Sequence, residues 1–240
     1  MIDLHAHVLP DLDDGPATLE EAVTLVNQAY HDGVRAIVAS PHGFNGLYNV
    51  HRTDVLARVA ELQEALKRAG IGVEILPGME VYLNLDLLGQ LKLGQALGIN
   101  QTRYVCIELP TGQLPLFTGE MLFDLKAAGY TPVIAHPERN AQVQAKPETL
   151  LRLSPGGWAM VSAPSLVGLY GPAPRRTAEA LISRGMARFL CSDAHHLKRR
   201  PFLLTRAVQH AAEIVGKARA EAMVMGHPAS LLATRGAAVL

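Results

Sequence analysis

The chain of 240 residues carries 22 Lys and Arg against 22 Asp and Glu, so its formal net charge is zero, and 49% of its residues are hydrophobic. This composition excludes a disordered chain, which would combine low hydrophobicity with a high net charge. It also argues against a protein that binds nucleic acid, because such proteins usually carry a basic surplus that pairs with phosphates. At ~150 residues per domain, the length allows one large domain or two small ones.

The hydropathy pattern predicts a protein with no membrane insertion. No hydrophobic run reaches the ~20 residues that cross a bilayer. Near the amino terminus, Asp3, His5 and His7 stand where a secretory signal would place basic residues followed by a hydrophobic stretch. We therefore expect a cytoplasmic protein.

Short β-branched runs alternate with longer amphipathic segments along the whole chain, which is typical of repeated βα units. Thr18 and Glu21 have the spacing of a helix capping box. Because the chain has no internal repeat and no Pro/Gly/Ser-rich linker, we expect residues 1–240 to form a single domain. The predicted strands are residues 2–7, 34–40, 73–76, 104–109, 132–136, 158–162 and 188–192.

The βα pattern favours an α/β barrel. Parallel strands joined by helices form either an open sheet or a closed barrel, and the glycine-rich phosphate turn expected after the first strand of a dinucleotide-binding sheet is missing. In a βα barrel the reactive residues lie at the carboxyl ends of the strands. The barrel interpretation therefore predicts that metal-binding or catalytic residues lie at or just after the ends of the predicted strands.

Residues with metal-binding side chains lie at or just after six of the seven predicted strands. His5 and His7 are two residues apart, and in an extended chain this spacing points both side chains to the same side. Three aspartates, Asp11, Asp13 and Asp14, follow the first strand. The strand-end candidates are His5, His7, His42, Glu80, Glu108, His136, Asp193 and His195.

This mixture of imidazoles and carboxylates points to metal ions. A lone histidine or glutamate in such a place would most often be structural, but several buried together without cations cost several kcal/mol per unpaired charge. Nitrogen and oxygen ligands without a thiolate suit Mn, Fe or Zn, and a carboxylate can bridge two ions. The candidates are also more numerous than one tetrahedral ion requires.

Two arginines stand close to these candidates in the sequence. Arg139 follows His136, and Arg200 ends a basic run after His195. A guanidinium beside a metal cluster is suited to bidentate capture of a phosphate or carboxylate, so we expect an anionic substrate. Arg199 is interpreted as a solvated residue. The glycine-rich and aromatic loop at residues 43–49 is either a mobile lip over the site or a plain surface loop.

The two cysteines, Cys106 and Cys191, are too few for a disulfide framework or, on their own, for a structural zinc site. Each lies two residues before a candidate ligand, so we expect both thiols to face the barrel interior below the ligands. A thiol phosphatase needs an arginine six residues after its cysteine, where this chain has a glycine and a leucine. Thiol catalysis is therefore disfavoured.

Together these motifs resemble the polymerase-and-histidinol-phosphatase (PHP) superfamily, and within it the bacterial manganese-dependent protein-tyrosine phosphatases of capsule and exopolysaccharide operons. The resemblance covers nearly the whole chain. The matching segments are residues 2–7, 13–16, 40–42, 78–82, 107–108, 133–139, 192–195 and 200–201.

The resemblance implies a distorted (β/α)7 barrel that holds three divalent metal ions, manganese in the first instance, with Fe or Zn as alternatives. Arg139 and Arg200 carry over as the phosphate-binding catalytic residues. For the third ion, Asp13 is the alternative to its neighbour Asp14. The implied ligands are His5, His7, Glu80 and Asp193 for the first ion, Glu80, Glu108 and His136 for the second, and Asp14, His42 and His195 for the third.

The implied activity is that of a protein-tyrosine phosphatase, a phosphoric monoester hydrolase that acts through metal-activated hydroxide. Its implied substrate is an autophosphorylated bacterial tyrosine kinase that controls capsular or exopolysaccharide synthesis. One alternative is a small-molecule phosphatase of the same superfamily, such as histidinol-phosphate phosphatase. Another is a polymerase-associated PHP module, which the neutral charge and the complete set of candidate ligands disfavour.

Overall fold

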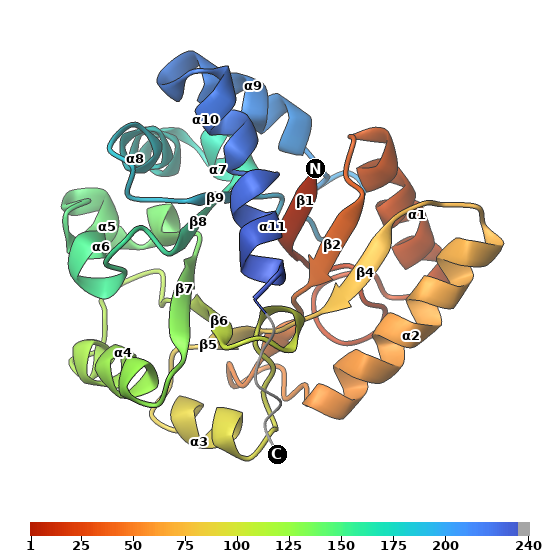
Figure 1. Ribbon diagram of the computed structural model, residues 1–240, viewed down its shortest axis with the longest axis horizontal. Coiled ribbons are helices and arrows are strands. Elements are labelled where there is room, and N and C mark those ends of the chain that lie inside the picture. Colours follow the sequence, from red (N-terminus) through yellow and green to blue (C-terminus); the bar gives the residue numbers. More distant parts are fainter. Residues whose placement is uncertain (235–240) are drawn as a thin grey trace.

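The strands of the computed structural model, which describes residues 1–234, pair in parallel and surround one interior (Figure 1). Every ladder between named strands is parallel. The strands are β1 (Ile2–Ala6), β2 (Ala36–Ala39), β3 (His42–Gly43), β4 (Glu74–Pro77), β5 (Glu80–Tyr82), β6 (Tyr104–Glu108), β7 (Thr131–Ala135), β8 (Ala159–Ser162) and β9 (Phe189–Cys191).

Two of the seven predicted strands are each divided into two short pieces. Ser40 and Pro41 separate β2 from β3, and proline interrupts a ladder because it has no N–H to donate. Gly78 and Met79 separate β4 from β5, and a Cβ on Gly78 would lie only 2.6 Å from Cγ1 of Val38. The sheet is therefore assigned as β1-β2-β4 followed by β3-β5-β6-β7-β8-β9.

The first and last strands lie side by side and close the barrel. The backbone N–H of Asp193 donates to the carbonyl of His5 at 3.0 Å, and the N–H of His7 donates to the carbonyl of Ala194 at 2.8 Å. Closure and the two divided strands together give the distorted seven-stranded barrel that the family resemblance implies.

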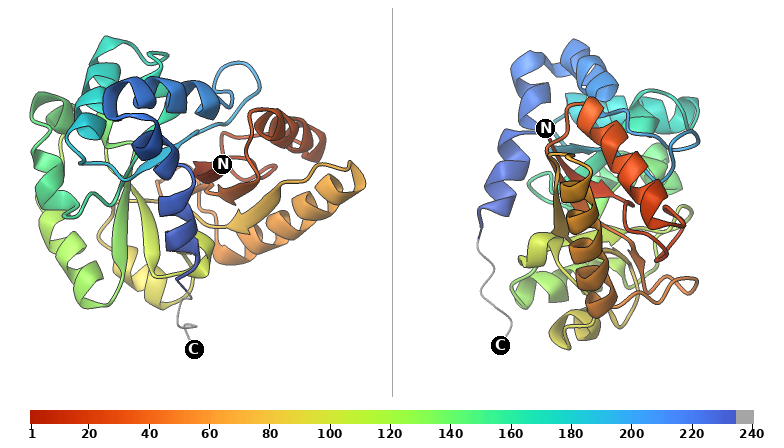
Figure 2. Two further views of the ribbon diagram at one scale, coloured as in Figure 1. Left: turned by 45° about the horizontal axis from the view of Figure 1, so that its top comes forward. Right: turned by 90° about the vertical axis from the view of Figure 1, so that its right-hand side faces the viewer.

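Helices cover the outside of the strands (Figure 2). Half of the predicted capping box forms at the start of the first of them: the Glu21 N–H donates to Oγ1 of the N-cap Thr18 at 3.2 Å, whereas the Glu21 carboxylate accepts from the N–H of Ala17, one residue before the cap. None of the helices within residues 1–234 is long and apolar enough to cross a membrane. They are α1 (Leu19–His31), α2 (Arg52–Arg68), α3 (Leu87–Lys92), α4 (Thr118–Ala127), α5 (Ala141–Ala145), α6 (Thr149–Leu153), α7 (Ala163–Leu166), α8 (Pro172–Ser183), α9 (Leu204–Val215), α10 (Lys217–Ala222) and α11 (Gly226–Leu232), with 3-10 turns at Ile99–Gln101 and Pro137–Arg139.

The barrel interior has its own apolar cluster, separate from the larger core between strands and helices. Cys106 and Cys191 belong to this interior cluster and are fully buried, as predicted. Leu231 of α11 joins it, and Figure 1 shows α11 lying across the strands. One end of the barrel is therefore filled with apolar side chains, which leaves the carboxyl ends of the strands for polar ones.

Strand register brings specific polar residues side by side at that end. His42 is the register partner of Glu80 in the β3–β5 ladder. Tyr82 is the partner of Glu108 in the β5–β6 ladder, which places Glu108 two residues beyond the level of Glu80. The parallel ladders thus fix which candidate ligands can meet before any side-chain contact is considered.

Candidate metal centre

The nine candidate metal ligands form one connected cluster at the carboxyl ends of the strands. In each of four groups, one ligand atom per residue lies within 4.8 Å of the ligand atoms of the others. The groups share members, so the cluster is continuous. They are His7, Asp14, His42 and His195; His5, His7 and Asp193; His5, Glu80 and His136; and His42, Glu80 and Glu108.

Glu80 is at the centre of this cluster and is almost completely buried. Its Oε1 lies 2.6 Å from Nε2 of His136 and 3.5 Å from Nε2 of His5. Its Oε2 lies 3.0 Å from Nδ1 of His42 and 3.4 Å from Nε2 of His7. The two oxygens of one carboxylate therefore face different histidine pairs, which is the arrangement a bridging ligand needs.

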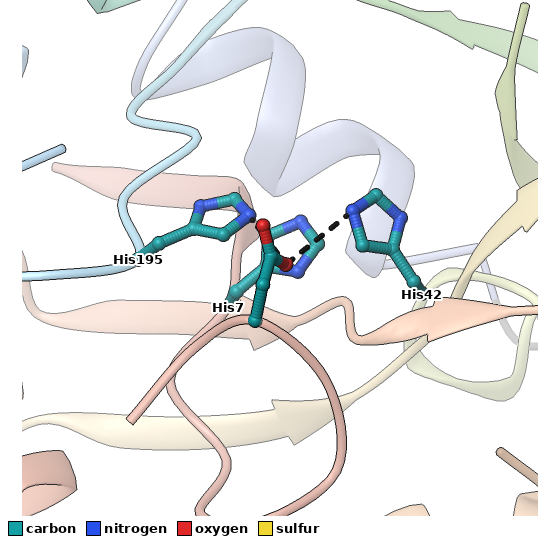
Figure 3. A group of neighbouring side chains, drawn as sticks. His7, His42 and His195 are labelled. Atoms are coloured by element: carbon teal, nitrogen blue, oxygen red, sulfur yellow. Dashed lines mark ion pairs between the residues drawn. The ribbon is translucent and has the colours of Figure 1, made fainter. Parts of the chain in front are cut away.

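A second part of the cluster gathers three imidazoles around Asp14. Figure 3 shows the rings of His7, His42 and His195 converging from separate segments. Oδ1 of Asp14 lies 3.3 Å from Nε2 of His195 and 3.6 Å from Nε2 of His42. The rings of His7 and His195 stack with centroids 3.6 Å apart.

Asp13 and Asp14 take different positions, although the sequence left both open as ligands. Oδ2 of Asp13 lies 2.5 Å from Nδ1 of His7 and accepts from the backbone N–H of His42. Its Oδ1 accepts from the N–H of Gly15. Asp13 therefore orients His7 from outside the cluster, whereas Asp14 lies among the candidate ligands.

The grouping differs in two respects from the one that the family resemblance implies. Glu108 lies with His42 and Glu80, whereas the resemblance places it with His136. His7 lies with the Asp14 group as well as with His5 and Asp193. Strand order explains the first difference, because β3 carries His42 directly beside β5 in the sheet.

Two candidate ligands have left-handed backbone within two residues of the ends of their strands. His136 has a φ of 28° and Asp193 a φ of 50°, a region that costs roughly 1–2 kcal/mol for a residue with a side chain. This conformation ends β7 at Ala135 and β9 at Cys191, one residue earlier than predicted in each case. Strain of this kind is found where a site dictates the direction of a side chain.

Mutual contacts shift the pKa values of the clustered residues. Burial opposes protonation of His42, but the adjacent carboxylates of Glu108 and Glu80 raise its pKa to about 11. Burial and then the neighbouring His7 lower the pKa of His195 to about 4. Burial opposes the charge of Glu80, yet the surrounding histidines hold its pKa well below the usual range. The carboxylates thus remain ionised in a buried site and attract cations.

Several buried ligand atoms have no hydrogen-bond partner within the described part of the chain. An unpaired buried polar atom usually costs ~1–3 kcal/mol, so such a concentration at one place points to an additional bonding partner. The unpaired atoms converge in the groups given above, which fits divalent cations. They are Nε2 of His5, His7 and His195, Nδ1 of His42, Oδ1 of Asp14 and Oε2 of Glu80.

Arg139 and Arg200 both contact Asp193 from the side of the cluster that faces a small cavity. Nη1 of Arg139 lies 3.2 Å from Oδ2 of Asp193, and Nη2 of Arg200 lies 2.8 Å from its Oδ1. Nη1 of Arg200 also lies 3.4 Å from Oδ2 of Asp14. Both arginines line a cavity of about 320 Å³ with Thr111, Tyr170 and Pro174.

Three further residues around the cluster were not among the predicted site residues. Sγ of Cys106 lies 3.6 Å from Nδ1 of His5, so this thiol contacts a candidate ligand from the barrel interior. Asp3 lies on β1, two residues before His5, and its carboxylate accepts from the N–H of His5 and of Ser192. Tyr170 has no motif in the sequence that would mark it. Only the alternation along residues 2–7 could have indicated Asp3.

The loop at residues 43–49 folds compactly over His42. Asn45 accepts from the N–H of Leu47 and of Tyr48, and Gly43 bridges to Asn49. The ring of Tyr48 lies nearly parallel to that of His42, with centroids 6.0 Å apart. The loop therefore covers one side of the site.

Residues 1–233 match the family described as "Capsular polysaccharide synthesis, CpsB/CapC". The chain belongs to the CpsB/CapC family. It is 34% identical to the tyrosine-protein phosphatase YwqE of Bacillus subtilis over 203 residues, which covers 84% of this chain and 80% of YwqE. It is 30% identical to the tyrosine-protein phosphatase CpsB of Streptococcus agalactiae over 240 residues, covering 97% of this chain and 98% of CpsB.

A solved structure agrees with this assignment. It comes from work on YwqE of Bacillus subtilis and CpsB of Streptococcus pneumoniae, which describes them as unique metal-dependent tyrosine phosphatases. The TM-score is 0.91 at 31% identity, over 97% of this chain and 94% of the other. The family resemblance and the barrel predicted from the sequence are thereby confirmed.

Proposed function

We propose that this chain is a metal-dependent protein-tyrosine phosphatase that hydrolyses phosphotyrosine and acts in capsular or exopolysaccharide synthesis. The single observation that carries the proposal is the contact between two partly buried arginines and the ligand cluster. The guanidinium groups of Arg139 and Arg200 flank Asp193 and open onto a shared cavity. Groups that bind anions therefore lie directly beside the candidate metal ligand Asp193. The relatives of this chain are tyrosine-protein phosphatases.

We propose three divalent ions, with manganese as the native metal. The unpaired buried ligand atoms support this proposal, as does a donor set of histidine nitrogen and carboxylate oxygen without thiolate. When bound, the ions would activate a water molecule for attack on phosphorus and neutralise charge on the phosphoryl group. The residues that would hold them are His5, His7, Asp14, His42, Glu80, Glu108, His136, Asp193 and His195.

The chain's own residues bind and orient the substrate. Arg139 and Arg200 present planar guanidinium groups that match the oxygens of a phosphate monoester. Asp193 fixes both side chains and so sets the position of the phosphoryl group relative to the ligand cluster. The leaving phenolate has a pKa of ~10, so the reaction depends less on a side-chain acid than hydrolysis of an alkyl phosphate does.

The rim of the site favours a protein substrate over a small metabolite. Exposed leucines lie on loops that follow five different strands, and the carboxyl ends of parallel strands share one end of the barrel. Exposed apolar side chains at this end suit contact with a polypeptide, and a small polar molecule such as histidinol phosphate does not need them. The leucines are Leu47, Leu85, Leu116, Leu169 and Leu197.

We further propose an autophosphorylated bacterial tyrosine kinase as the protein substrate, since a protein that controls capsule synthesis by tyrosine phosphorylation needs a phosphatase of this kind. The cytoplasmic location and the single-domain organisation of residues 1–240 stay predictions. Residues 235–240 lie outside the described part of the chain.

The function is tested by comparing two substrates after manganese is restored to metal-free protein. We expect turnover of a phosphotyrosine peptide to exceed turnover of histidinol phosphate by at least ~100-fold, and elemental analysis to find about three metal ions per chain. Equal turnover of both substrates would favour the small-molecule phosphatase. Full activity in the presence of a chelator, with no bound metal, would contradict the proposal.

Manganese binding should release protons, because the raised pKa of His42 means that it carries a proton in the metal-free fold near neutral pH. The ion pairs of protonated His42 with Glu80 and Glu108 stabilise the metal-free fold fully below pH ~6.5, and this contribution is lost as the pH rises towards 11. We therefore expect apparent manganese affinity to rise about tenfold per pH unit above pH 7 for each displaced proton. Titration in weak buffer with a pH indicator measures the release.

The matched control is His42→Ala, which should release about one proton fewer per chain. Binding without any proton release in the parent protein would show that His42 is neutral before the metal arrives.

A further inference from the structure

The cavity beside the ligand cluster contains a hydroxyl group that neither the family match nor the predicted site residues account for. Tyr170 lines this cavity together with Arg139 and Arg200. Its hydroxyl oxygen is buried and has no hydrogen-bond partner within residues 1–234. A buried hydroxyl without a hydrogen-bond partner usually lowers the stability of the fold by ~1–3 kcal/mol. Its position therefore points to a bound ligand that accepts its hydrogen bond.

The backbone holds Tyr170 in a fixed place. It lies between α7 and α8, where the N–H of Leu169 donates to the carbonyl of Pro164 and the N–H of Gly171 donates to that of Gly168. Gly171 has a φ of 90° and leads directly into α8. Two consecutive turns thus present the ring to the cavity from a segment that carries none of the candidate metal ligands.

The neighbours of the hydroxyl determine what it can bind. The guanidinium carbon of Arg139 lies 5.4 Å from the centroid of the Tyr170 ring, which orients the ring by a cation–π contact. Because both guanidinium groups line the same cavity, the O–H is placed to donate to an anion bound there. A phosphate monoester has three terminal oxygens and can therefore accept from both guanidinium groups and from the hydroxyl at once.

We propose that Tyr170 is a third substrate-binding residue, whose hydroxyl donates to a terminal phosphoryl oxygen alongside Arg139 and Arg200. This inference rests on the proposed phosphatase function and on the phosphate-binding role of the two arginines. A hydroxyl that contacts a terminal oxygen acts on phosphate itself, so its contribution is independent of the leaving group. It also binds the product, inorganic phosphate, as well as the substrate.

The test is Tyr170→Phe, which keeps the ring over Arg139 and removes only the oxygen. We expect kcat/KM for a phosphotyrosine peptide to fall about tenfold, because the lost hydrogen bond is to a charged group. The inhibition constant for inorganic phosphate should rise by a similar factor. The loss should be the same for p-nitrophenyl phosphate, whose leaving group is better. Metal content should match that of the parent protein, and thermal stability should be equal or higher, because the variant lacks an unpaired buried hydroxyl.

Tyr104→Phe is the matched control, because Tyr104 lies at the start of β6 and packs against Trp158, away from the site. It should change none of these quantities. Parent-like kinetics in Tyr170→Phe would show that only the ring matters and would overturn the inference. A loss confined to the poorer leaving group would overturn it as well, because the hydroxyl would then act on the leaving oxygen. Failure of the parent protein to hydrolyse either aryl phosphate would instead contradict the proposed function.

Discussion

Glu80→Ala is expected to lower phosphatase turnover by more than ~100-fold and to reduce bound metal from about three ions per chain to one or none. Residues that merely support metal ligands cost 10–100-fold when they are removed, so a central ligand should cost more. The two Glu80 oxygens face four histidines, of which His136 and His42 are the nearest at 2.6 Å and 3.0 Å. Elemental analysis and steady-state kinetics on the same preparations measure both effects.

Asp14→Ala is the comparison, since Asp14 belongs to a single ligand group and its side chain is 40% exposed. We expect it to lose about one ion and to retain more activity than Glu80→Ala. Because alanine at position 80 also leaves buried histidines without a counter-charge, Glu80→Gln serves as a variant of the same shape. Equal and mild losses at positions 80 and 14 would mean that Glu80 does not bridge.

The parts of the site that follow from local geometry could be predicted from the sequence. His5 and His7 share a side because an extended chain alternates, and the ends of parallel strands meet because the helices return each strand to the same edge. These two facts are enough to gather all nine candidate ligands. They require no knowledge of which strand lies beside which.

The division of the cluster into groups depends on contacts that the sequence does not contain. Glu108 lies with His42 because both are next to Glu80: His42 is the register partner of Glu80 in the β3–β5 ladder, and β5 also pairs with β6, which ends at Glu108. The choice between Asp13 and Asp14 depends on a turn in which Asp13 accepts from Gly15 N–H. Neither feature changes the pattern of residue types along the chain, so periodicity does not distinguish the alternatives.

Tyr170 was missed for a related reason. It reaches the site from the segment between α7 and α8, after the one predicted strand that ends without a candidate ligand. That strand ends at Ser162, whose hydroxyl and N–H donate to Glu138, the residue just before Arg139. β8 therefore supports the segment that carries Arg139. This contribution depends on β8 lying beside β7 in the barrel and leaves no mark in the sequence.

The same closure explains why one arginine of a basic run enters the site and its neighbour does not. The carbonyl of Arg200 accepts from the N–H of His195 at 2.9 Å and from that of His196 at 3.2 Å, so the segment folds back on itself. This reversal returns the Arg200 side chain to Asp193, and only 19% of it remains exposed. Arg199, at the turn, is exposed.

Arg200→Ala is therefore expected to reduce kcat/KM for a phosphotyrosine peptide by at least ~10-fold, since a charge-assisted hydrogen bond contributes ~1.5–3 kcal/mol. If the guanidinium binds substrate and transition state equally, KM rises alone, and if it binds more tightly as charge moves onto the phosphoryl oxygens, kcat falls as well. Metal content should be unchanged, because the carboxylates of Asp193 and Asp14 remain. Arg139→Ala should behave in the same way.

Arg199→Ala is the control for this prediction, because it removes the same charge from the adjacent position without reaching the site. It should leave both kinetics and metal content at parent values. Equal damage from Arg199→Ala would mean that the basic run acts through its overall charge and not through the guanidinium that the backbone reversal directs at Asp193. Loss of metal in Arg200→Ala would show that this arginine works by holding Asp193 in place, since its Nη2 lies 2.8 Å from Oδ1 of that carboxylate.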